Sequence, residues 1–242
     1  MLTDSSEPPE KQRFAWLRPQ KEWGIIGGAL IAFVALMGPW YLLEPVFKQL
    51  FPHLDMGINL KVALATAVIE LLAIGIVAAA LAAYGKKPRD IGFTKIKRSH
   101  VLAAFVGFAG YFAISVAINL IARNFIDANQ AQNLGYQHLS GREILAAFLP
   151  LVLLTPFAEE IIFRGVLFKG FRRHMPFWLA SLGVSALFGL VHGQWNVGLD
   201  VFVMSLVSCY LVERTKSIWP SIFLHTIKNG LAFWLLYLYN GG

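Results

Sequence analysis

The stretch TPFAEEIIFRGVLF, residues 155–168, places two adjacent carboxylates, Glu159 and Glu160, in a run that is otherwise apolar. An ionised carboxylate is among the costliest groups to place in hydrocarbon, so such residues usually face the interior of a helix bundle. Because a helix turns 100° per residue, Glu160 and Arg164 share one face and can pair. Glu159 points about 140° away from Arg164 and is left available. The stretch therefore predicts a membrane helix with one neutralised and one available carboxylate.

The composition of the whole chain is that of a polytopic membrane protein. Of its 242 residues, 57% are hydrophobic and 14% are charged, whereas soluble domains carry about 25% charged residues. The mean hydropathy is +0.58. The net charge is +7, but the basic residues lie between apolar segments, which argues against a nucleic-acid-binding protein. The single cysteine, Cys209, excludes an intrachain disulfide and an all-thiolate metal site.

Seven apolar segments predict the fold class. Most are near the ~20 residues that a spanning helix needs. We therefore expect an all-α bundle of about seven (six to eight) transmembrane helices with a polar site inside it. The segments are 24–43, 60–83, 101–122, 144–168, 176–192, 197–212 and 218–238.

The connections between the apolar segments alternate between many and few Lys and Arg residues, which predicts the orientation of the protein in the membrane. The first 22 residues hold four, the loop 84–100 six and the connection 169–175 three, whereas the loop 123–143 has two and 193–196 none. The positive-inside rule then puts the N-terminus in the cytoplasm. We expect residues 1–22 to be a cytosolic tail, because they lack the apolar core of a cleaved signal peptide. Residues 23–129 would form N-terminal transmembrane helices, and 130–242 a catalytic core.

Two later segments carry polar residues at helical spacing. The fifth ends with FGLVHG, where Phe188 and His192 are four residues apart, and the seventh contains HTIKN, which places His225 and Asn229 on one face. A single membrane histidine is most often an interhelical hydrogen-bonding group. Two Glu, two His and one Asn on three apolar helices are instead expected to face one another or a water-filled cavity.

Helix depth tests whether these groups can meet. If the fourth helix continues to about Arg172, Glu159 lies ~18–20 Å from its inner end, and the histidines converge with it near mid-membrane. We therefore predict a long fourth helix, with Arg164 inside the bundle. In the second segment, Glu70 is also intramembrane, and we expect it to pair with Lys228.

In this order, on successive membrane segments, the motifs resemble those of the CPBP family, also called Abi, which comprises type II CAAX prenyl endopeptidases and bacteriocin-processing enzymes. The resemblance covers about residues 130–242, and RDIGF (89–93) is similar to a short segment that often precedes the core of the family. The matching motifs are EExxxR (Glu159, Glu160, Arg164), FxxxH (Phe188, His192) and HxxxN (His225, Asn229).

The resemblance implies an intramembrane endopeptidase in which Glu159 activates water, His192 assists, and His225 with Asn229 stabilises the oxyanion. The residue types suit this chemistry, because peptide hydrolysis needs a base and donors aimed at the developing oxyanion. The same set leaves zinc open as a cofactor, with Glu159, His192 and His225 as ligands and water in the fourth position. We favour no cofactor, because Asn229 is a poor zinc ligand and a natural oxyanion donor.

We predict hydrolysis of a peptide bond in a peptide or in a lipid-linked or membrane protein. The expected location is a bacterial inner membrane, with membrane lipid and no nucleic acid among the partners. One alternative is a non-catalytic membrane scaffold or bacteriocin-immunity-type binding protein. Another is a proton-coupled transporter, since Glu and His within spans also suit proton relays, although no paired repeats support it.

Overall fold

The described part of the chain is helical throughout. The computed structural model describes residues 23–122, 124 and 134–239, so the expected tail and the expected core boundary at residue 130 lie outside the described residues. Within them the chain forms seven helical rods and no strand, which confirms the all-α polytopic class. The rods are α2 (Ile25–Leu50), α3 (Ile58–Ala83), α4 (Arg98–Ala122), a composite helix (Arg142–Arg172), α8 (Phe177–Leu190), α9 (Trp195–Thr215) and α10 (Trp219–Phe233) with its continuation Trp234–Tyr239.

Five of the seven rods are long and apolar enough to cross a membrane: α2, α3, α4, the composite helix and α9. Helix α8 has 14 residues, or ~21 Å, which is shorter than the ~30 Å hydrocarbon core. Helix α10 carries His225, Lys228 and Asn229 within 15 residues and is therefore less apolar. The short helix α8 and the more polar helix α10 both contribute to the polar interior of the bundle.

The composite helix confirms the predicted long fourth helix, because it runs without interruption over 31 residues to Arg172. Three α-helical parts, α5 (Arg142–Phe148), α6 (Thr155–Glu160) and α7 (Lys169–Arg172), alternate with wider π-helical turns. Pro150 and Pro156 lie in this helix, and each removes a backbone donor from the regular ladder. Wider turns of this kind often accompany functional sites, and here they flank the two carboxylates on both sides.

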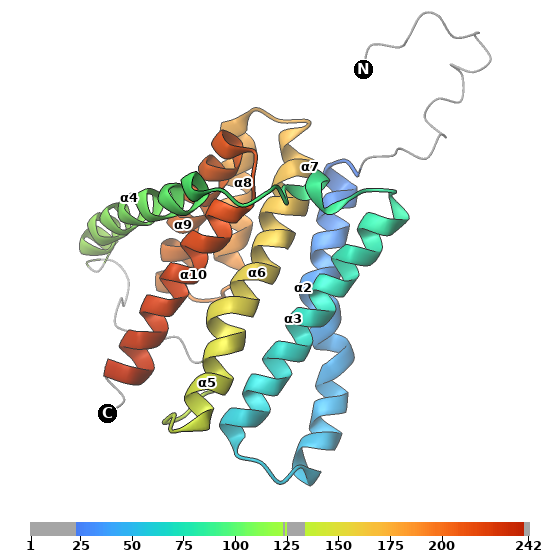
Figure 1. Cartoon of the computed structure of the whole chain (residues 1–242), viewed down its shortest axis with the longest axis vertical. Coiled ribbons are helices and arrows are strands. Elements are labelled where there is room, and N and C mark those ends of the chain that lie inside the picture. The colour runs from blue at the N-terminus through green and yellow to red at the C-terminus, as the bar shows by residue number, and fades with distance from the viewer. Residues whose placement is uncertain (1–22, 123, 125–133, 240–242) are drawn as a thin grey trace, which may run out of the picture.

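The composite helix also lies at the centre of the bundle. Figure 1 shows α2 and α3 on one side of it and α8, α9 and α10 on the other. The turn from Ile161 to Phe168 is buried at every residue, as expected for a central element. Helix α4 lies across the flank of the bundle at a steep angle to the other long helices and packs against α9 and α10.

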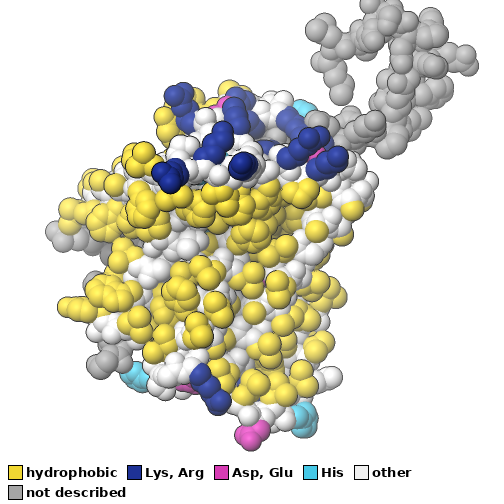
Figure 2. Space-filling view, in the orientation of Figure 1, with side chains coloured by type: hydrophobic (Ala, Val, Ile, Leu, Met, Phe, Trp, Pro, Cys, Tyr) yellow, Lys and Arg dark blue, Asp and Glu magenta, His cyan; other side chains and the backbone are white. Residues whose placement is uncertain are grey.

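Basic side chains gather at one end of the molecule, above a broad apolar band (Figure 2). The RDIGF segment helps to build this end. The backbone N–H of Ile218 donates to the carbonyl of Gly92 (2.9 Å), and Lys169 donates to the carbonyl of Asp90 (3.0 Å). A backbone hydrogen bond from Lys87 holds the pKa of the exposed Asp90 carboxyl below its usual value. The clustering matches the alternation of Lys and Arg along the chain, while the side of the membrane on which this end lies stays a prediction.

Candidate active site

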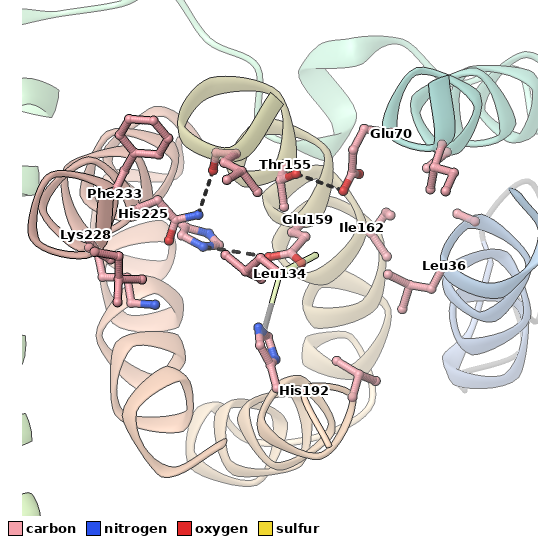
Figure 3. Close-up of a pocket in the computed structure, with 18 of the residues that line it drawn as sticks. Leu36, Glu70, Leu134, Thr155, Glu159, Ile162, His192, His225, Lys228 and Phe233 are labelled. Carbon is pink, nitrogen blue, oxygen red and sulfur yellow. Dashed lines mark hydrogen bonds and ion pairs between the residues drawn. The ribbon is translucent and has the colours of Figure 1, made fainter. Parts of the chain in front are cut away.

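A cavity of about 370 Å³ opens between the composite helix, α10, the end of α8 and the pair α2 and α3 (Figure 3). Its polar lining comes from residues far apart in the sequence, which the packing of these helices brings together. Apolar side chains, among them Leu36, Ile162 and Phe233, form the rest of the wall. The polar lining includes Glu70, Thr155, Glu159, His192, His225, Lys228 and Asn229.

Glu160 lies behind the cavity wall, paired with Arg164 as predicted. Nη1 of Arg164 is 3.0 Å from Oε1 of Glu160, and both side chains are 0% exposed. The guanidinium also lies over the ring of Phe188, with its central carbon 4.7 Å from the ring centroid. A buried charge is tolerated only when it is paired, so Arg164 and Glu160 depend on each other. This carboxylate is therefore occupied by a structural partner.

Glu159 has the opposite environment, because it lines the cavity and its side chain is 19% exposed. His225 lies between the two carboxylates. Its Nδ1 is 3.0 Å from Oε1 of Glu160, and its Nε2 is 3.7 Å from Oε2 of Glu159. The longer distance exceeds a direct hydrogen bond and suits a bridging water. The predicted split into one held and one available carboxylate is present in the geometry.

His192 enters the cavity from the turn that follows α8 rather than from within the helix, which ends at Leu190. Its Nδ1 is 2.7 Å from the carbonyl oxygen of Phe188. A carbonyl can only accept, so Nδ1 carries the proton and Nε2 of the neutral ring is an acceptor. The ring of Phe188 packs against both His192 and His225, with centroid distances of 5.0 and 5.9 Å. Phe188 thus holds the two imidazoles, as a supporting residue would.

Asn229 is fixed to the composite helix. Its Nδ2 donates to the carbonyl of Leu151 (3.0 Å), and the side chain lines the cavity. An amide has two N–H donors, so one remains for another acceptor. The structure therefore places Glu159, His192, His225 and Asn229 around one cavity, with Glu160, Arg164 and Phe188 directly behind. The catalytic roles of these residues stay predictions.

The alternative zinc set does not fit this arrangement. Within the described ranges, no three His, Cys, Asp or Glu side chains lie close enough together to hold one metal ion. Glu159, His192 and His225 thus share a cavity without forming a ligand set. Whether activity depends on a metal stays a prediction.

The expected pair of Glu70 and Lys228 is wrong. Glu70 instead accepts a hydrogen bond from the hydroxyl of Thr155 (3.0 Å). Lys228 lies 3.8 Å from Asp200 on α9, which also accepts a hydrogen bond from Tyr111 on α4 (2.8 Å). Thr155 was not among the predicted site residues, although it lies four residues before Glu159 and so on the same helix face.

The part of the chain that carries most of these residues is similar to a known family. Residues 141–231 match the family described as "Type II CAAX prenyl endopeptidase Rce1-like". This segment contains Glu159, Glu160, His192, His225 and Asn229. No solved structure matches the chain.

Three curated relatives are similar over part of their length. The Bacillus subtilis protein named "Putative membrane peptidase YdiL" is 35% identical over 86 residues, which are 34% of this chain and 35% of that protein. "Uncharacterized protein YyaK" of the same organism is 32% identical over 136 residues, which are 51% of this chain and 44% of that protein. An Escherichia coli "Uncharacterized 24.3 kDa protein" is 27% identical over 128 residues, which are 51% of this chain and 56% of that protein. The chain thus spans between about a third and just over half of these relatives. The predicted family resemblance is confirmed over residues 141–231, where this multi-pass membrane protein matches the type II CAAX prenyl endopeptidase family.

Proposed function

We propose that the protein is an intramembrane endopeptidase in which Glu159 activates the attacking water. The family match and the name of the B. subtilis relative support a membrane peptidase at the level of class. One observation carries the assignment of the base. Of two adjacent glutamates, Glu160 is sealed against Arg164 at 0% exposure, whereas Glu159 opens on the cavity beside two imidazoles.

In this mechanism a water in the cavity gives a proton to Glu159, and its oxygen attacks the carbonyl carbon of the scissile peptide bond. Nε2 of His192 accepts a hydrogen bond from the same water and orients it. The remaining N–H of Asn229 donates to the oxyanion that forms on the carbonyl oxygen. When the C–N bond breaks, the proton held by Glu159 passes to the leaving amine, with His225 close enough to relay it.

Glu160 and Arg164 supply positioning rather than chemistry. Glu160 fixes the ring of His225 through Nδ1, and the ion pair with Arg164 holds Glu160 in place. An imidazole held through one nitrogen presents its other nitrogen in a fixed direction, here toward Glu159. This arrangement holds the base and its partner at a set distance before substrate binds.

The substrate in this proposal is a peptide or a lipid-linked or membrane protein, and no metal takes part. The location we propose is a bacterial inner membrane, with the basic end of the bundle and the N-terminus on the cytoplasmic side. A peptide enters the cavity in extended form, because a peptidase must reach the backbone carbonyl.

The test compares membrane and secreted peptidomes of a host carrying either the wild-type protein or Glu159→Gln at matched expression. Glu44→Gln is the matched control, because Glu44 lies on α2 outside the cavity lining and pairs with the exposed Lys48, and such pairs contribute little. We expect a precursor that accumulates in Glu159→Gln only, together with loss of its mature end. Identical peptidomes in all three strains would overturn the proposal and favour a non-catalytic binding protein.

A further inference from the structure

Glu70 is a carboxyl group that faces the cavity from outside the matched family segment. It lies on α3, twelve residues after Ile58 and thirteen before Ala83, which is ~18–20 Å from either end of the helix. Figure 3 shows Glu70 approaching the same cavity as Glu159, from the facing helix. A carboxylate at this depth is expected to have a function or a charged partner.

Glu70 has no cationic partner among the residues that the structure describes. Its hydrogen bond comes from the neutral hydroxyl of Thr155, on one of its two oxygens. Lys228, which also lines the cavity, forms an ion pair with Asp200, and Arg164 forms an ion pair with Glu160. The cations near the cavity are therefore neutralised by other acids, and Glu70 retains an oxygen that can accept from a ligand.

The resulting charge of the cavity complements a cationic ligand. The side chains of Glu70 and Glu159 both face the cavity. His225 lies against Glu159 and Glu160 and not against Glu70. In a poorly solvated site, opposite charges attract more strongly than in water. A site built around an unpaired carboxylate also rejects ligands that leave it unpaired.

From this geometry, and resting on the proposed peptidase function, we propose that Glu70 is a specificity-determining residue that selects substrates with a cationic amine or guanidinium close to the scissile bond. The matched segment, residues 141–231, supplies the proposed chemistry. Glu70 is the one carboxyl group of the described cavity lining that lies outside that segment. Selection and chemistry thus reside on different helices, α3 and the composite helix with α10.

The first experiment measures binding without cleavage. Full-length Glu159→Gln protein in nanodiscs is titrated with acetylated, amidated apolar decapeptides in which one lysine occupies each position in turn. Each peptide has a match with norleucine, which has a side chain of similar length and no charge. A third set with a free N-terminus and no lysine tests whether a terminal ammonium supplies the cation.

We expect a lysine peptide, or a peptide with a free N-terminus, to bind about tenfold more tightly than its uncharged match in at least one register. Adding Glu70→Gln should bring that ratio close to one, because glutamine keeps the shape and loses the charge. Glu70→Asp should restore part of the preference, which a merely structural role would not do. Equal binding of charged and uncharged peptides, a preference that survives Glu70→Gln, or no binding of any peptide would overturn the proposal.

Cleavage by protein with intact Glu159 separates this proposal from the peptidase assignment. With Glu70→Gln we expect KM for the lysine substrate to rise about tenfold while kcat changes little, because the group acts on binding. Equal cleavage of lysine and norleucine peptides would refute the selection by Glu70 and leave the peptidase standing. A binding preference that depends on Glu70, without cleavage of any peptide, would show that Glu70 selects cationic ligands and would refute the peptidase assignment.

Discussion

The adjacent glutamates should give opposite results when each loses its charge. Glu160→Gln leaves the guanidinium of Arg164 at 0% exposure without a counter-charge. Breaking a buried ion pair by removing one partner costs about 3–5 kcal/mol. In Glu159→Gln the side chain is partly exposed and faces a cavity, so we expect a change of about 1 kcal/mol or less, the scale of one hydrogen bond.

The single cysteine provides the assay. Cys209 is 0% exposed, so a fluorogenic maleimide reports unfolding of the bundle when the thiol becomes accessible. For a chain of this size each kcal/mol shifts the midpoint by about 2–4 °C, so Glu160→Gln should lower it by about 6–20 °C. Glu159→Gln should unfold near the wild-type temperature and yet lose cleavage. Removing both charges, in Glu160→Gln with Arg164→Met, should recover much of the lost stability, because no unpaired buried charge remains.

Two outcomes would refute this reasoning. A wild-type midpoint for Glu160→Gln would show that the buried pair does not hold the bundle together. A destabilised Glu159→Gln would show that Glu159 is architectural, and its loss of activity would then say nothing about catalysis.

Three further predictions concern other parts of the site. Asn229→Ala should lower kcat by about 10²–10³ by removing an oxyanion donor, and a matched drop in KM would argue against that role. Gly189→Ala should lower stability by about 1–3 kcal/mol, because a Cβ at Gly189 would lie 2.8 Å from the carbonyl oxygen of Gly198 and force α8 away from α9; an unchanged unfolding midpoint would contradict this. Dialysis against a chelator should leave the cleavage rate unchanged, and recovery of a lost rate on adding zinc would show that a metal is needed.

Local spacing predicted those parts of the site that lie within one helix. The pairing of Glu160 with Arg164 follows from four-residue spacing, and so does the shared face of His225 and Asn229. Such relations need only the helix to form. The number of helices was likewise set by the apolar segments, because a spanning helix must satisfy its backbone internally.

Relations between helices were harder to predict. Glu70 and Lys228 were expected to pair because both are intramembrane ionisable residues. Instead, Glu70 accepts a hydrogen bond from Thr155 and Lys228 pairs with Asp200. Sequence spacing does not fix which helices are neighbours or how deep each residue lies. The steep crossing of α4 against α9 and α10 brings Tyr111 to Asp200, and that contact helps to hold the partner of Lys228. A single sequence contains no local signal for such a crossing.

The adjacency of the two glutamates itself explains how a free carboxylate can exist inside the bundle. A lone base in hydrocarbon would need a partner to be tolerated, and that partner would then neutralise it. Here the charge of Arg164 is balanced by Glu160, which lies one residue and 100° away from Glu159. The fixed pair also holds His225, which approaches Glu159 without forming a close contact. Because Arg164 pairs with the adjacent Glu160, Glu159 can lie in a buried, polar cavity and still be available to water.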